Sequence, residues 1–484
     1  MATDFLNGVE TKEQKVSSTV ADVNKSIIGI VGTAPTFMLD NEYKTLNKLC
    51  PIRNYNDIIR YAGRDIDGFT LPDALKTILD ESGGATIYMV NVFDENKHKT
   101  SVSNQTVTPV GNKININKIG INDIVLMNGQ VEGIQGEDFL VAESLTECII
   151  ELLSEDFKTA ESLSLSYTYA DTTLVTTSDI VGEVNEESVT GLKLLNKVNA
   201  EFGDSVGIII VPEYSAEPVV RNEIEKLEEN LKAYAFLDTK KDLSINDVIN
   251  SRNRELNNSN LISTSSHSMI VYPYLKRYNE DLDKISLKPA SPVAAGMRVK
   301  LDRNRTIAKS ITNTKTVTTL GLETPIEFIL NNPSSESNAL NASGVSTFIN
   351  YKGGYYLWGA RSCNFPSESG INTLESARRT ADFIEQSIED ASFPAIGENI
   401  DTNYIEGILE MINSSFKTWS TPKNPQRLIL SGEAFYDSSI NSAEDLANGH
   451  IKFSYKFCPL GVAERITYYA YIDINIFTDV LGGE

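Results

Sequence analysis

Two glycines in the run GGYYLWGARS have the spacing of a phosphate-binding loop. Gly354 and Gly359 stand where the motif G-x-x-x-x-G-K-[ST] places its glycines. In that motif small residues let backbone N–H groups surround a phosphate, while the lysine reaches its outer oxygens. Here Ala360 replaces the lysine, and aromatic residues, which favour a strand packed on a core, fill the loop. No helical periodicity follows, so we interpret the stretch as a strand and not as a nucleotide site.

A second run has the spacing of a hydrolase nucleophile. Gly203, Ser205 and Gly207 match G-x-S-x-G, but the nucleophile elbow requires a strand before the serine and a helix after it. The chain has the reverse order, because the helical pattern GLKLLNKVNAEF precedes the serine and the apolar run VGIIIV follows it. We therefore expect a turn from a helix to a strand.

The residues that could bind a metal or perform redox chemistry are scattered. None of the histidines and cysteines forms an H-x-x-x-H or C-x-x-C pair, and acidic residues are too numerous for a catalytic pair to be recognised. We expect surface or strand histidines, free thiols in a reducing cytosol, and no catalytic, cofactor or metal site. The residues concerned are His98, His267, His450, Cys50, Cys148, Cys363 and Cys458.

Length and charge exclude several classes of partner. The chain has 484 residues, enough for about three domains. Its 66 acidic and 43 basic residues give a formal net charge of −23, which repels nucleic acid and anionic membranes. No stretch approaches the roughly 18 apolar residues of a membrane helix. The polar start lacks a secretory signal, so we expect a protein made and kept inside the cell until something else releases it.

Hydrophobic periodicity predicts a chain of several domains. Strand and helix patterns alternate around a doubly wound α/β domain with parallel strands, and short alternating runs predict an inserted β-sandwich. Two amphipathic helices and a β-rich end, IKFSYKF to RITYYAYIDINIF, predict an α+β C-terminal domain. The predicted parts are an N-terminal arm (1–24), a first core part (25–96), the β-sandwich (97–178), the central α/β domain (179–345), a C-terminal core domain (346–474) and a C-terminal arm (475–484).

Several of these runs, in this order, resemble the tail sheath proteins of contractile phage tails and R-type bacteriocins. They are NGVE near the start, KSIIGIVGTAP, the WGARS that ends the glycine run, and GHIKFSYKFCPLGVAERITYYAYIDI. The inserted β module is similar to the insert of some family members. The likeness covers nearly the whole chain, although each motif alone is only moderately specific.

The resemblance implies a structural subunit and no enzyme. Sheath subunits polymerise helically around a tail tube in an extended, metastable state, and their contraction drives the tube through a cell envelope. The implied partners are further copies of the chain, the tail tube protein, and baseplate and tail terminator proteins, with no nucleic acid and no membrane insertion. The implied location is a virion tail or bacteriocin particle assembled in the bacterial host cytoplasm. For the central domain the resemblance implies a subtilisin-like fold without protease function.

The two arms have the composition that strand exchange between subunits requires, because a strand added to a neighbour's sheet gains main-chain hydrogen bonds. We expect glycines in the arms to act as hinges, and an arginine pair on the first C-terminal helix to face the tube or to pair with Glu375 or Asp382 of its own helix. The exchange candidates are Val9, Val16, Val20, Ile472, Ile474, Ile476 and Phe477, the hinge candidates are Gly8, Gly482 and Gly483, and the tube-facing candidates are Arg378 and Arg379.

Two other classes of protein stay open at this point. A hydrolase or nucleotide-binding enzyme on the central α/β domain would turn over a substrate, or would be stabilised by its ligand. A surface-layer or capsid-type protein would polymerise into sheets or shells and not into tubes.

Overall fold

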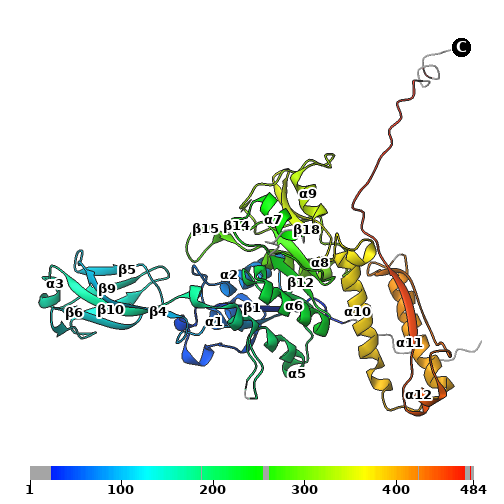
Figure 1. Cartoon of the computed structure of the whole chain (residues 1–484), viewed down its shortest axis with the longest axis horizontal. Coiled ribbons are helices and arrows are strands. Elements are labelled where there is room, and N and C mark those ends of the chain that lie inside the picture. Colours follow the sequence, from blue (N-terminus) through cyan, green and yellow to red (C-terminus); the bar gives the residue numbers. More distant parts are fainter. Residues whose placement is uncertain (1–22, 187, 254–260, 423, 475–479, 481–484) are drawn as a thin grey trace, which may run out of the picture.

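The computed structural model describes residues 23–186, 188–253, 261–422, 424–474 and 480. Figure 1 shows an elongated molecule in which a β module lies at one end, an α/β body in the middle, and a pair of long helices with a β-hairpin at the other end. Beyond the hairpin the C-terminal segment leaves the body and extends away from it.

A nine-stranded, mostly parallel sheet forms the centre of the body. β1 pairs in parallel with both β3 and β11, and β12, β13 and β18 continue the parallel run. Antiparallel strands complete the two edges. Across the sheet the strands are β16 (Thr314–Lys315), β19 (Gly354–Trp358), β18 (Val345–Tyr351), β13 (Ser268–Tyr272), β12 (Tyr234–Asp238), β11 (Ile208–Ile210), β1 (Ile28–Gly32), β3 (Ile87–Asn91) and β2 (Leu49–Ile52).

This sheet corrects the predicted boundaries of the body. Strands from 25–96 and from the segment after 346 pair with strands from 179–345, so the division at these positions cuts through one sheet. The alternation of strands and helices predicted the parallel strands, but it carried no information on which of them lie side by side.

Helices cover both faces of the sheet because the central strands are apolar on both sides. In β11, for example, Ile208 and Ile210 point into one hydrophobic cluster and Ile209 into the other. The first cluster lies under α1 (Tyr55–Tyr61), α2 (Leu71–Ser82) and α8 (Ser291–Asn304). The second lies under α4 (Thr177–Val181), α5 (Val198–Phe202), α6 (Pro218–Leu231), α7 (Ile245–Arg252) and α9 (Glu336–Ala342). The body also contains a small antiparallel sheet. Its strands are β15 (Lys284–Lys288), β14 (Leu275–Asn279) and β17 (Gly321–Leu322).

The β module consists of two antiparallel sheets around a shared hydrophobic cluster that includes Leu126, Phe139, Ile150 and Leu165. Its strands lie within the predicted range 97–178. One sheet contains β4 (Lys99–Val107), β10 (Leu163–Ala170), β6 (Asn122–Asn128) and β7 (Val131–Glu132). The other contains β5 (Lys113–Ile116), β9 (Cys148–Leu152) and β8 (Phe139–Glu143), and the short helix α3 is Glu155–Lys158.

The C-terminal lobe is built on two long helices, α10 (Glu375–Ser392) and α11 (Thr402–Ser420). They were predicted from their apolar stripes, and residues such as Ile384 and Phe416 are buried between them. The hairpin of β20 (Ile429–Phe435) and β21 (Ser454–Pro459) packs on α11, and α12 (Ala443–Ala447) lies between its strands in the sequence.

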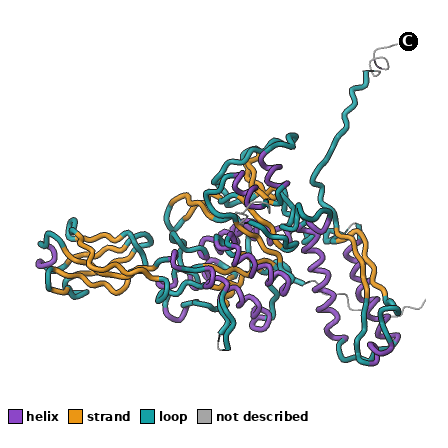
Figure 2. Tube along the Cα trace, in the orientation of Figure 1, coloured by secondary structure: helices purple, strands orange, loops and turns teal. Residues whose placement is uncertain are grey.

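The strand predicted after this hairpin is absent from the described residues. Residues 460–474 belong to no strand (Figure 2), because a strand requires a hydrogen-bonded neighbour and the described part of the chain places none beside them. The alternation in RITYYAYIDINIF predicts a strand, but it does not supply the second backbone that a strand needs.

Candidate functional site

The glycine run is a structural element of the sheet. Residues 354–358 form β19, which pairs antiparallel with β18, so the interpretation as a strand is confirmed. Gly359 follows at φ +136°, and a Cβ atom there would lie 2.5 Å from Ser346 Oγ. The glycine therefore permits close approach of two backbone segments, which a larger residue would prevent.

The serine of the G-x-S-x-G run occupies the predicted helix-to-strand turn. Helix α5 ends at Phe202, Gly203 adopts a left-handed conformation with φ +73°, and β11 begins at Ile208. The Ser205 hydroxyl accepts a hydrogen bond from Gln386 Nε2 at 3.1 Å. This order is the reverse of a nucleophile elbow.

The structure does bring one serine, histidine and aspartate together. His267 Nε2 lies 3.1 Å from Asp382 Oδ1, and its Nδ1 lies 3.1 Å from the hydroxyl of Ser266, its neighbour in sequence. Asp382 also accepts a hydrogen bond from Arg378 Nε at 3.0 Å. In a Ser-His-Asp triad the aspartate contacts Nδ1 and the nucleophilic serine contacts Nε2, whereas here the two ring nitrogens are exchanged and the serine is the histidine's neighbour in sequence. Here the group ties the chain before β13 to α10.

The other histidines considered as possible metal ligands have different surroundings. His98 is buried, against the expectation of a surface or strand position, and contacts Phe93 and Asp179 where the β module joins the body. Over the described ranges, no group of three histidines, cysteines or acidic residues is placed to hold a metal ion. Nor does any helix there combine the length and apolarity needed to cross a bilayer.

The C-terminal segment that leaves the body (Figure 1) carries several exposed apolar side chains. Ile466, Tyr468, Ile472 and Ile474 are 67%, 87%, 95% and 71% exposed. Water around so many neighbouring apolar groups is unfavourable, which makes this segment a candidate for covering by another chain. The structure thus exposes two exchange candidates, Ile472 and Ile474.

The remaining candidates in the arms lie outside the described residues. They are Gly8, Val9, Val16, Val20, Ile476, Phe477, Gly482 and Gly483.

The arginine pair on α10 divides into two different environments. Arg379 is only 2% exposed and cannot face a tube in this conformation, so its prediction as a tube-facing residue is corrected. Its guanidinium donates to both carboxylate oxygens of Asp302 on α8, at 2.9 and 2.7 Å. Arg378 keeps 24% of its side chain exposed and pairs with Asp382 and Glu385 of its own helix, as the alternative interpretation expected for Asp382.

These contacts belong to a buried network of charges between α8 and α10. Asp302 also accepts hydrogen bonds from Arg298 Nε at 3.0 Å and from Ser26 Oγ at 3.0 Å, and Arg298 Nη1 reaches Glu375 at 3.2 Å. Burial favours the protonated form of Asp302, but the two arginines outweigh it and hold its pKa below the ordinary value. No local pattern predicts this network, because the two helices that it joins lie far apart in the chain.

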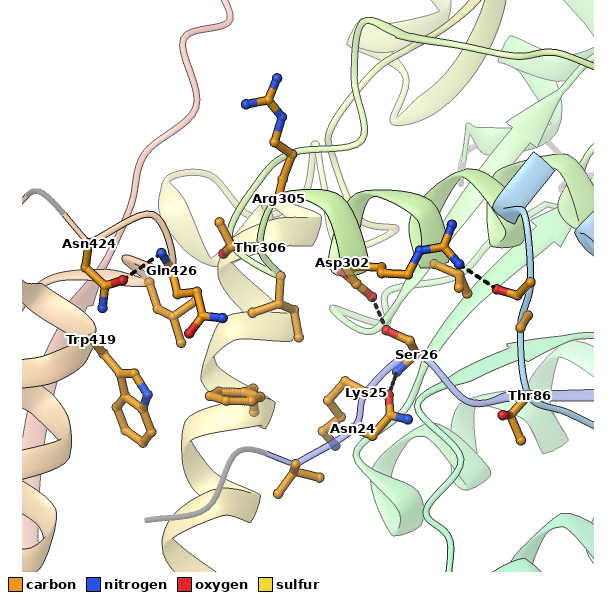
Figure 3. Close-up of a pocket in the computed structure, with 18 of the residues that line it drawn as sticks. Asn24, Lys25, Ser26, Thr86, Asp302, Arg305, Thr306, Trp419, Asn424 and Gln426 are labelled. Atoms are coloured by element: carbon orange, nitrogen blue, oxygen red, sulfur yellow. Dashed lines mark hydrogen bonds between the residues drawn. The ribbon is translucent and has the colours of Figure 1, made fainter. Parts of the chain in front are cut away.

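A cavity of about 880 Å³ lies beside this network, between the body and the C-terminal lobe (Figure 3). Trp419 and Phe383 line its lobe side, and Lys25 and Ser26, close to where the described chain begins, line the body side. Burial lowers the pKa of Lys25 to about 8. The described chain therefore begins at the junction of the body and the C-terminal lobe.

Comparison with known proteins gives matches along the chain. Residues 187–363 match the family described as phage tail sheath protein central domain. The tail sheath protein of Burkholderia phage BcepMu is 29% identical, and the alignment covers all of both chains. The tail sheath protein of Escherichia phage P2 is 22% identical over 96% of this chain and 94% of its own.

Solved structures with the same fold include two contracted sheaths. The sheath complex of the extracellular contractile injection system PVC aligns with a TM-score of 0.59 at 14% identity, covering 98% of this chain and 100% of the other. The contracted helical sheath of the anti-feeding prophage aligns with a TM-score of 0.56 at 13% identity, covering 97% and 99%.

Proposed function

Because the chain belongs to the family of contractile tail sheath proteins, we propose that it polymerises helically around a tail tube and contracts to drive that tube through a target cell envelope. It is a structural sheath subunit. The observation that carries it is the exposed apolar C-terminal segment, whose sequence alternates as in a strand although its described residues form none. The extended, metastable starting state is part of the proposal.

Strand exchange gives this segment a role. A strand from residues 466–474 that joins the sheet of another copy gains main-chain hydrogen bonds of roughly 0.5–1.5 kcal/mol each, and it buries its exposed apolar side chains. Because the donating segment and the accepting edge are different surfaces, the contact repeats from copy to copy and produces a helical polymer. Val9, Val16, Val20, Ile476 and Phe477 remain proposed participants.

The hairpin of β20 and β21 is a suitable acceptor. It forms a two-stranded sheet on its own within the described residues, and such a ribbon is marginally stable without further strands. Leu430 and Phe435 on β20 are 51% and 39% exposed. An added strand would pair an open edge and cover part of this apolar surface.

Contraction then requires the bodies to rotate and slide while the arms keep neighbouring copies connected. Gly8, Gly482 and Gly483 are the proposed hinges, since glycine accepts the backbone changes that such motion demands. We further propose that Arg378 contributes to a weak, reversible grip on the tube, and that the particle also contains baseplate and terminator proteins.

We also propose a fold type for the central domain and for the β module. A mostly parallel sheet with helices on both faces supports a subtilisin-like central domain. Two sheets around one hydrophobic cluster support a sandwich at 97–178. The proposed location is a phage tail or bacteriocin particle assembled in the bacterial cytoplasm.

Negative-stain microscopy of the purified protein tests the proposal. We expect hollow tubes with a regular axial repeat from the full chain, and none from a chain that lacks residues 1–24 and 475–484. Replacement of Ile472 and Ile474 by lysine should also abolish tubes, because charge on a paired apolar strand is costly.

Replacement of Val110 and Val131 by lysine is the matched control, since these exposed valines lie on the β module. That variant should assemble normally. Monomers from the full chain and the shortened chain alike would contradict strand exchange and direct attention to an enzymatic site on the α/β body.

A further inference from the structure

Arg361, in the run WGARS after β19, holds a residue of the C-terminal segment. Its Nε donates to Glu464 Oε1 at 2.9 Å, and its Nη2 donates to Glu464 Oε2. Two parallel hydrogen bonds between a guanidinium and a carboxylate fix the orientation of the carboxylate as well as its distance from the guanidinium. The pair is partly exposed, with 23% of the arginine side chain and 40% of the glutamate side chain accessible.

The body fixes the arginine independently of the glutamate. Arg361 Nη1 donates to Gly370 O at 3.0 Å and to Thr373 Oγ1, and its Cζ atom lies 5.2 Å from the centre of the Phe365 ring. These contacts use one edge of the planar guanidinium and leave the other edge directed at Glu464. Little side-chain freedom is therefore lost when the carboxylate binds.

Glu464 lies where the C-terminal segment changes from packed to exposed. Two residues earlier, Val462 packs against the small cluster of Ala360, Leu374 and Ala377. Two residues later, Ile466 is 67% exposed. The ion pair thus lies at the point where the segment leaves the body.

The surroundings allow the pair to open without repacking a core. A cavity of about 210 Å³ adjoins it, lined by Glu464 and Arg361 together with residues of the α9–β18 turn and Gly359. A bidentate pair beside a cavity can break and re-form while the body stays intact.

We infer that Arg361 is a positioning residue that clamps Glu464 and thereby sets the point and the direction in which the C-terminal segment leaves the body. With the clamp closed, the exposed strand is offered to a neighbouring copy in one orientation. When the Arg361–Glu464 ion pair is broken, only Val462 and the residues before it pack against the body, and the segment after them samples many orientations. The link from this orientation to assembly rests on the proposed strand exchange.

Distances between spin labels test the clamp in the monomer, below the concentration at which tubes form. Labels at Lys352→Cys and Tyr468→Cys, in a Cys458→Ser background, report on the arm relative to the body, because the other cysteines are buried. We expect Glu464→Gln to widen the distance distribution at least about twofold. Glu464→Asp, which keeps the carboxylate, should give an intermediate width. An unchanged width in Glu464→Gln would overturn the clamp.

Glu155→Gln is the matched control, since Glu155 forms an exposed ion pair with Lys158 on the β module, away from both the arm exit and the hairpin. It should leave the distribution unchanged.

Assembly gives the second measurement. The concentration needed for tube formation should rise about threefold in Glu464→Gln, the change expected for one exposed ion pair per contact, and stay constant in Glu155→Gln. A wider distribution with unchanged assembly would overturn the role of arm direction. Absence of tubes from the unaltered chain would instead contradict the proposed function, and the distance measurement would still decide whether the clamp exists.

Discussion

Arg379→Gln is the most informative perturbation of the fold, because a prediction from the sequence and the structure disagree about this residue. A tube-facing arginine could be replaced without loss of stability. In the structure Arg379 is 2% exposed and joins α10 to Asp302 of α8 and to the carbonyl oxygen of Lys25, the latter at 3.0 Å. The substitution therefore removes charge from a buried network between the body and the C-terminal lobe.

The expected cost follows from burial. Removal of one partner from a buried ion pair costs about 3–5 kcal/mol, because the remaining charge loses its compensation in a poorly solvated site. Arg298 still contacts Asp302 after the change, which places the expected loss near the lower end of that range. Arg378→Gln is the matched control on the adjacent residue. Arg378 is 24% exposed, and Asp382 keeps its contact with His267 after the change, so the loss should be smaller, about 1 kcal/mol.

Urea unfolding followed by circular dichroism measures the difference for the transition that melts α8 and α10. We expect the midpoint of Arg379→Gln to fall well below that of Arg378→Gln. Acidification should reduce the difference, because the pKa of Asp302 lies below its ordinary value and its stabilising contribution is lost as pH falls through that pKa. Equal stability of the two variants would refute the assignment of a buried network.

Three further substitutions test other positions. Burial raises the pKa of Glu228 to about 8, so its contribution to stability is lost as pH rises from its ordinary value of 4.5 through 8. Glu228→Gln should remove this pH dependence and stabilise the protein by at least about 1 kcal/mol at pH 8. Thermal unfolding at pH 6 and pH 8 measures the effect. If stability changes between these two pH values as much in the variant as in the unaltered protein, the prediction is wrong. Gly359→Ala should destabilise the body by about 1–3 kcal/mol in urea unfolding. Gly407→Ala, in helix α11 with open space around it, should instead stabilise its lobe by about 0.5–1 kcal/mol, and a loss there would contradict the reasoning.

Much of the fold could be predicted because local patterns decide it. The stripe that includes Ile384 and Ile388 identified α10, and the unbroken apolar run at Ile208 to Ile210 identified a strand buried on both faces. The turn containing Ser205 followed from the order of its neighbouring elements. In each case the evidence lies within a few residues.

The C-terminal end shows what a local pattern leaves out. Alternating side chains at Ile466 to Ile474 describe a strand, yet no strand forms in the single chain. Side-chain alternation states which face each residue would occupy, whereas a strand exists only where a second backbone accepts its hydrogen bonds.

By itself, the sequence determined the elements, the scattered placement of candidate ligands and the family resemblance. Tertiary structure alone decided the environment of Arg379 and the pairing of Arg361 with Glu464. Helical periodicity places Arg379 away from the apolar stripe, but it cannot state whether that polar face meets water or the charges of another helix. The physical reason is that burial and ion pairing depend on distances between residues far apart in the chain, which no local pattern contains.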